Sequence, residues 1–228
     1  MGDIEATFRD LNRLLRKASI AEIGGFRPPA NLITSWFGGK GIGLPGEQLP
    51  DYEGKELFPL LQVVTSELPF RPPQLDGITA LVVFIDRVDI PLMTPHGEGW
   101  LIREYTGLDH LVPLPPSSLP PVVRSFPIRW RLVTDDAPGW EAAASLIDIN
   151  PIADSDDATR RFWDDYHRHQ GTKLGGWPEE IQQGLIGVEN FVFQIDSNSD
   201  AGWQWGDAGI GYFMKDPDGT WHFSWDCC

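Results

Sequence analysis

The chain has 228 residues, of which 41% are hydrophobic and 22% charged, so it can bury a core as a single folded domain spanning residues 1–228. Its 33 acidic residues outnumber the 18 Lys and Arg and give a net charge of −15, which argues against nucleic acid and anionic membranes as partners. The 24 Gly and 20 Pro predict many chain reversals and few long helices.

The first predicted element is an amphipathic helix over residues 3–19, where apolar residues recur at helical spacing. Gly and Pro pairs at 24–25 and 28–29 end any helix, and an extended element is expected near 31–36. The acidic start is no secretory signal. The longest apolar run, residues 78–85, is far shorter than the roughly 20 residues that span a bilayer, which predicts a cytoplasmic protein.

Two buried strands are predicted at residues 57–64 and 78–85, which are short, apolar and rich in β-branched or aromatic residues. A Pro-rich middle follows over residues 91–151, where proline clusters separate short extended pieces such as 99–105 and 122–133. This middle part is expected to lie outside the regular β units.

In the last third of the chain, the sequence predicts two helices followed by three strands. A short helix is expected at residues 140–146 and a longer one at 156–170. The longer helix begins with acidic residues and is expected to end before Gly171. His167 and His169 are interpreted as favourable charges at the end of that helix. Three strands are expected at residues 191–195, 210–214 and 220–225, with a hairpin turn at 216–219.

The sequence contains an internal recurrence of short blocks, which we call the echo. Three blocks recur in the same order: SWFGG (35–39) with TKLGG (172–176), LLQV (60–63) with VFQI (192–195), and VF (83–84) with YF (212–213). Such recurrence predicts a duplicated β unit, with copies over about residues 31–90 and 171–228. The expected fold class is α+β and mainly β: internally duplicated antiparallel units in one compact domain, with the N-terminal helix and one further helix packed outside.

These motifs resemble the YwqG-like bacterial proteins of unknown function, from about residue 32 to the C-terminus. The residues that carry the resemblance are 35–39 with Leu61-Gln62, GGWP (175–178) with Ile181-Gln182, FQID (193–196) and WGDAG (205–209). The resemblance implies a mainly β fold with internal duplication, and it brings no reaction, cofactor or catalytic residue.

Polar residues in the repeated blocks are candidates for a small-ligand or catalytic cleft between the two units, since interfaces between lobes favour pockets. The candidate ligand-binding residues are Gln62, Lys173, Gln182, Gln194 and Asp207.

The loop DSNSDAGWQWGD is a second candidate, as a metal site. It carries oxygen side chains at Asp196, Asn198, Asp200 and Asp207, and alternating oxygen ligands can surround Ca²⁺. Gly202 falls one position late for a calcium loop and the flanks are predicted strands, so an ordinary Asx-rich turn explains the same letters. Both interpretations remain open at this point, and no cofactor is otherwise predicted.

The preferred functional hypothesis is a non-catalytic module that binds and sequesters a basic protein, as immunity proteins do. It rests on the charge of −15 and on the lack of the Gly-x-Ser-x-Gly, His-Glu-x-x-His and Cys-x-x-Cys motifs in the sequence. The adjacent Cys227 and Cys228 cannot cross-link a domain, which agrees with a reducing compartment. The alternative is an enzyme or small-ligand-binding protein that uses the cleft between the units.

Overall fold

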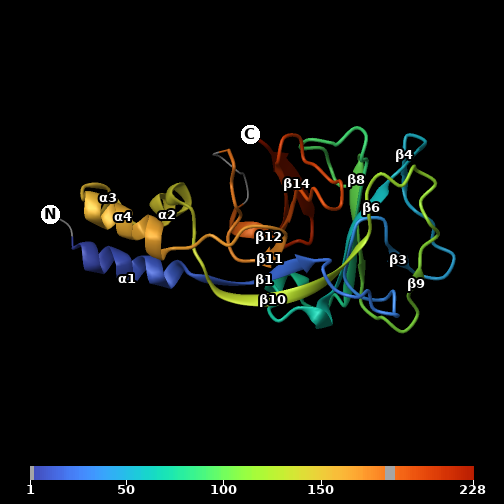
Figure 1. Cartoon of the computed structure of the whole chain (residues 1–228), viewed down its shortest axis with the longest axis horizontal. Helices are drawn as coiled ribbons and strands as arrows, with labels where there is room; N and C mark the ends of the chain where they lie inside the picture. Colours follow the sequence, from blue (N-terminus) through green and yellow to red (C-terminus); the bar gives the residue numbers. More distant parts are fainter. Residues whose placement is uncertain (1–2, 183–187) are drawn as a thin grey trace.

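The computed structural model describes residues 3–182 and 188–228, and its main feature is one ten-stranded antiparallel sheet that curls into a nearly closed barrel (Figure 1). The strands from one edge to the other are β14 Trp221–Asp226, β13 Ile210–Lys215, β12 Phe191–Asp196, β11 Lys173–Gly175, β1 Arg16–Ile23, β10 Phe126–Asp136, β2 Trp36–Phe37, β6 Phe58–Val64, β7 Ala80–Ile85 and β8 Trp100–Tyr105. Both edge strands contribute to one core, because the ring of Trp100 in β8 lies 5.2 Å from the ring of Phe223 in β14. The expected mainly β fold is confirmed.

Smaller elements complete the β part of the molecule. They are the pair β3 Ile42–Gly43 and β9 Val112–Pro113, the hairpin β4 Asp51–Tyr52 and β5 Lys55–Glu56, and the 3-10 turns η1 Thr65–Glu67, η2 Pro73–Leu75 and η3 Val188–Asn190.

The strands predicted from apolar runs are confirmed. Every residue of β6 and β7 is buried, because core residues cover both faces of these strands. The three C-terminal strands β12, β13 and β14 also lie where expected. The turn between the last two is closed by a 2.9 Å hydrogen bond from Asp216 N to Thr220 O, with Gly219 at a φ of 91°.

The predicted N-terminal helix over 3–19 was wrong in its last five residues. Helix α1 covers only Ile4–Leu14, and the residues expected to continue it form β1, which pairs with β10 on one side and β11 on the other. Ala18, Ser19 and Ile20 are all buried there, and the Ser19 hydroxyl bonds both the N–H and the carbonyl of Phe70. Pairing on both edges satisfies the backbone of this segment, which outweighs its weak helical periodicity.

The Pro-rich middle also contributes more to the fold than its composition predicts. It supplies the edge strand β8 and the eleven-residue strand β10, which lies at the centre of the sheet between β1 and β2. The prolines lie outside β10 except Pro127, near its first residue.

The helices gather at one end of the molecule, beyond the ends of β1 and β10, where they pack mainly on one another (Figure 1). They are α1, α2 Trp140–Leu146, α3 Asn150–Ala153 and α4 Asp156–Asp165. Phe8, Leu11, Ile152 and Phe162 form the centre of this helical cluster. Among the described residues, none of the helices has the length and apolarity needed to cross a membrane.

The predicted helix over 156–170 stops five residues early. Its C-cap is Tyr166, in an extended conformation, and the following segment lies beside the end of β10, where Ala137 N donates to His167 O at 3.0 Å. His167 and His169 are therefore in an extended segment rather than on a helix, which corrects the earlier interpretation.

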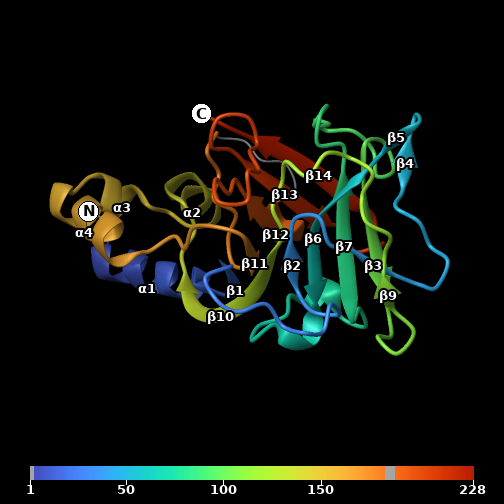
Figure 2. The ribbon, with the colours of Figure 1, turned by 45° about the vertical axis from the view of Figure 1, so that its right-hand side comes forward.

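The sheet has two halves, one on either side of the central strands β1 and β10 (Figure 2), and the two halves share a hydrogen-bond pattern. Trp36 pairs with Gln62 in one half, and Lys173 pairs with Gln194 in the other. The hydroxyl before each pair accepts a strand N–H: Val64 N donates to Ser35 Oγ at 3.1 Å and Asp196 N donates to Thr172 Oγ1 at 3.0 Å.

One predicted block match is displaced by one residue. Gln62 lies opposite Val82 in β7, and Gln194 lies opposite Tyr212 in β13, so the structural counterpart of Tyr212 is Val82 rather than Val83. A one-residue shift changes the face on which a strand side chain lies. The blocks around the two glutamines keep the register predicted from the sequence.

Candidate functional site

The most deeply buried charges in the chain are Asp136 and Lys173. Asp136 is the last residue of β10 and Lys173 the first of β11, and their side chains are 0% and 1% exposed. Lys173 Nζ donates to Asp136 Oδ2 at 2.9 Å. Burial lowers the pKa of Lys173 from its ordinary value, and the adjacent Asp136 carboxylate opposes that shift.

Asp136 also holds two separate backbone segments. Its Oδ1 accepts from His169 N at 2.8 Å, and its Oδ2 accepts from Trp177 N at 2.7 Å. Lys173 Nζ donates a second hydrogen bond, to His169 O at 2.7 Å. We call Asp136, Lys173, His169 and Trp177 the Asp136 network. It joins the segment after α4 to the Gly-Gly turn after β11.

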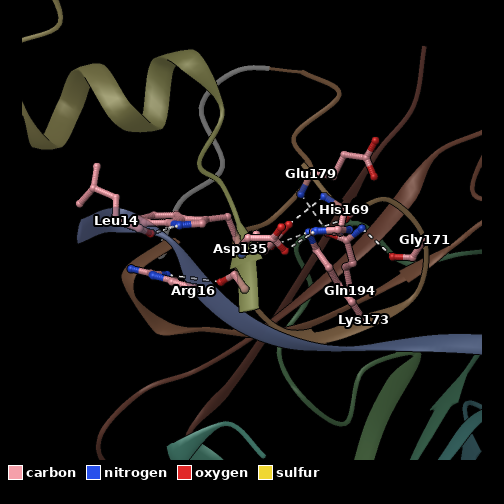
Figure 3. A network of polar contacts seen from close by, with 11 residues as sticks. Leu14, Arg16, Asp135, His169, Gly171, Lys173, Glu179 and Gln194 are labelled. Atoms are coloured by element: carbon pink, nitrogen blue, oxygen red, sulfur yellow. Dashed lines mark hydrogen bonds and ion pairs between the residues drawn. The ribbon is translucent and has the colours of Figure 1, made fainter. Parts of the chain in front are cut away.

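Trp177 extends this network to the N-terminal part of the chain (Figure 3). Its Nε1 donates to Leu14 O, the last residue of α1, at 2.7 Å. The guanidinium of Arg16 lies 3.4 Å from the centre of the Trp177 ring, a close cation–π contact. The network therefore lies at the junction between the helical cluster and the sheet.

Gln194 and Glu179 form the other side of the site (Figure 3). Gln194 accepts from Glu179 N through Oε1 and donates to Gly171 O through Nε2, both at 2.9 Å. The Glu179 side chain points away from Lys173, and its Oε2 is buried without a hydrogen-bond partner among the described residues. Burial raises the pKa of the Glu179 carboxyl.

A family model described as a domain of unknown function, DUF1963, matches residues 35–219. The chain belongs to the DUF1963 family. The matched range contains Asp136, Lys173 and Gln194 and both Gly-Gly turns, and it begins after α1 and β1. No curated protein matches the chain.

The sequence interpretation missed Asp136, Trp177 and Glu179 in the DUF1963 chain. One signal was available: Lys173 stands in the repeated block TKLGG at the position where SWFGG has the apolar Trp36, and a cation buried at such a position requires a buried counter-charge. The sequence alone could not identify Asp136 as that partner, because the two residues are 37 positions apart.

The five predicted ligand-binding residues lie in three separate places. Lys173 and Gln194 are neighbours in the network, whereas Gln62 is buried in the other half of the sheet, where its Nε2 donates to Leu32 O and Thr34 O. Gln182 is exposed and donates to Cys227 O at 2.7 Å, and Asp207 is exposed nearby. A groove of about 830 Å³ along β14 is lined by none of the five, and a ligand cleft built from them stays a prediction.

The four predicted metal ligands form a turn between β12 and β13. Asn198 Oδ1 accepts from Ala201 N at 2.7 Å, which is the hydrogen bond of an Asx turn, and Asn198 also pairs with Trp203. Asp200 and Asp207 are exposed and Asp196 is half-buried. Within the described ranges no three His, Cys, Asp or Glu are placed to hold a metal ion, and a metal at this loop stays a prediction.

This groove of the DUF1963 chain runs along β14 and has a volume of about 830 Å³. We call it the β14 groove. Its lining residues are 93–96, Glu189, Asn190, Met214, Asp216 and 220–224. Among these residues are two carboxylates, Glu189 and Asp216, and no Lys or Arg.

The two strand glutamines provide a matched test of the site. We expect Gln194→Leu to lower the free energy of unfolding by about 2–3 kcal/mol and Gln62→Leu by about 1 kcal/mol. Gln194→Leu leaves Glu179 N without its acceptor, whereas Gln62 Oε1 already has no partner among the described residues. Urea unfolding of both variants measures the difference, and equal losses would show that the hydrogen bond from Glu179 N to Gln194 adds no stability beyond the donor contacts that both glutamines make.

Asp196 provides a pH test. Burial and the nearby Glu179 carboxylate raise the pKa of Asp196 from 3.8 to about 6. Between these values the folded protein binds more protons than the unfolded chain, so this group's contribution to stability is present at low pH and is lost as pH rises through 6. We expect Asp196→Asn to raise the free energy of unfolding above pH 7 by up to about 1 kcal/mol, after allowing for solvent screening, and to have little effect near pH 4. Asp200→Asn, in the exposed part of the same loop, is the control, and a gain of the same size at both pH values would contradict the assignment.

Proposed function

We propose that this DUF1963 chain is a non-catalytic protein-binding module that captures and sequesters a basic protein. The observation that supports this is the distribution of charge. Of the 33 acidic side chains, Asp86 and Asp136 are the only fully buried ones among the described residues, and Glu179 and Asp196 are partly buried, so the negative charge lies mostly at the surface. A surface field of this sign attracts a basic partner and speeds its association.

The arrangement of the buried polar groups supports the same function. Lys173 and Gln194, which the sequence marks as candidate reactive groups, are committed to internal hydrogen bonds that hold strands and turns together. Their side chains are 1% and 0% exposed, so they offer no surface to a substrate. The site is therefore better suited to stabilising a scaffold than to performing a reaction.

We also propose that the sheet arose from a duplicated β unit and that the protein acts in the cytoplasm. The shared register of Trp36 with Gln62 and of Lys173 with Gln194 supports a duplicated β unit. The left-handed glycines that follow each strand, Gly39 at φ 65° and Gly176 at φ 73°, support it as well. We place the module in the cytoplasm and relate it to the YwqG-like proteins on the sequence motifs alone.

Capture from an extract of the native host tests the function. The purified chain, immobilised at low ionic strength, is expected to retain a basic protein in stoichiometric amount and to release it as salt rises, because screening weakens exposed charge pairs. The partner is then purified and the complex is reconstituted. Retention of no protein under several growth conditions, or binding that salt leaves unchanged, would refute the proposal.

A further inference from the structure

The two edge strands of the sheet, β8 and β14, differ in how their outward main-chain groups are bonded. At the β8 edge, the preceding loop folds back over the strand: His96 Nε2 accepts from Ile102 N, and Gly97 N donates to Trp100 O, both at 2.8 Å. These contacts use main-chain groups that would otherwise face outward. Covering an edge in this way is how proteins prevent a foreign strand from adding to the sheet.

Among the described residues, none covers the β14 edge in this way. β14 pairs with β13 alone, and no main-chain group of β14 bonds to a described residue outside β13. The side chains of Trp221 and Trp225 anchor the strand, because Trp221 Nε1 donates to Glu104 Oε1 and Trp225 Nε1 donates to Pro91 O. Alternate residues of a paired strand direct N–H and C=O groups to the side away from the neighbour. Within the ranges 3–182 and 188–228, β14 is therefore an anchored strand whose outer edge is unpaired.

The β14 groove lies beside this free edge and has two kinds of wall. Apolar side chains come from Met93, Met214, Trp221 and Phe223, and Met93 is 66% exposed at the rim. Met93 has a φ of 54°, a conformation that residues other than Gly, Asn and Asp rarely adopt. The charged wall consists of Glu189 and Asp216, and the Asp216 carboxylate already contacts His222 Nε2 and Asn190 Nδ2, both at 2.7 Å. The volume of about 830 Å³ lies in the range of sites that bind ligands.

We propose that the β14 groove binds an extended, basic segment of a partner protein, which adds to β14 as a further strand of the sheet. This inference rests on the proposed capture of a basic protein and names the surface that does it. In an added strand successive side chains alternate between the two faces. Basic side chains on one face would lie near Glu189 and Asp216, and apolar ones on the other would lie against Met93 and Phe223.

The net charge of the chain favours a basic segment of another protein over a second copy of this chain as the strand that binds in the groove. A second copy would bring its own net charge of −15 to the same edge, so like charges oppose pairing of two β14 strands. A basic segment of another protein is instead attracted by the same negative charge. β14 has six residues, so a hexapeptide matches its length.

The experiment uses the whole chain and a capped hexapeptide of alternating Lys and Val. Amide hydrogen exchange is followed by NMR. The peptide is expected to slow exchange at outward-facing amides of β14 about tenfold or more and to leave β8 unchanged. A peptide of the same sequence with alternate backbone nitrogens methylated lacks the hydrogen bonds along one edge and is expected not to bind. An alternating Glu and Val peptide tests the sign of the charge.

A charge-reversal pair tests the groove itself. Glu189→Lys is expected to weaken binding of the Lys and Val peptide by about five- to tenfold, because it reverses a charge in the groove wall. Glu53→Lys, in the β4–β5 turn and outside the groove lining, makes the same change in net charge and is expected to have a much smaller effect. Equal weakening by both variants would show long-range attraction only and would overturn the assignment to the groove.

Three further outcomes would overturn the proposal: no slowing of β14 exchange, tight binding of the methylated peptide, or concentration-dependent dimers that protect β14 in the free protein. Failure here and failure of the proposed function are distinguishable. A native basic partner captured without protection of β14 removes the docking surface alone. Protection of β14 by the peptide without any captured partner removes the sequestration function alone.

Discussion

Asp136→Asn is expected to lower the free energy of unfolding by about 3–5 kcal/mol, a large effect for a change of one atom. Asp136 accepts hydrogen bonds from Lys173 Nζ, His169 N and Trp177 N, all in the interior. The amide would leave Lys173 buried as an uncompensated cation and would turn an N–H₂ group toward one or more of these donors. Urea unfolding, followed by circular dichroism, measures the loss.

A double-mutant cycle separates the ion pair from the rest of the network. Lys173→Met is expected to cost less than Asp136→Asn, because the Asp136 carboxylate keeps its two backbone donors. The double variant should be more stable than the sum of the two losses predicts, by about 1–3 kcal/mol. The exposed pair Arg13 and Asp10 is the control, and Asp10→Asn should change stability by less than about 1 kcal/mol. Strict additivity in the cycle would contradict a coupled pair at Asp136.

The parts of the fold that the sequence predicted are those determined by local pattern. Residues 57–64 and 78–85 are apolar runs with turn signals on both sides, and they are strands because both of their faces are buried. The hairpin at 216–219 follows from Pro217 and Gly219, whose backbone preferences suit that turn.

The parts that the sequence did not predict depend on distant partners. Residues 16–23 have weak periodicity and become a central strand because β10 and β11, more than 100 residues away, pair with both edges. The site follows the same rule. Lys173 and Gln194 were singled out by their place in the echo, but the function of Lys173 depends on Asp136, which lies in no repeated block.

The recurrence of SWFGG (35–39) as TKLGG (172–176) predicts that Gly39 corresponds to Gly176. Gly39 and Gly176 end the two repeated turns with φ angles of 65° and 73°, so an alanine at either position adopts a left-handed backbone that costs about 1–2 kcal/mol. Their surroundings differ. A Cβ at Gly39 would meet Ser125 Oγ at 2.8 Å, the end of a side chain that can rotate away, whereas a Cβ at Gly176 would lie 2.1 Å from Asp136 Oδ2.

Gly176→Ala is therefore expected to cost about 4 kcal/mol or more, and Gly39→Ala about 1–2 kcal/mol, because only the first also displaces the carboxylate that neutralises Lys173. Thermal and urea unfolding of the two variants measure the difference. The excess loss should shrink when Gly176→Ala is combined with Lys173→Met, since a displaced Asp136 then leaves no buried cation unpaired. Equal losses in the two glycine variants would mean that Asp136 can move without cost, and the network would not be the rigid junction that its hydrogen bonds indicate.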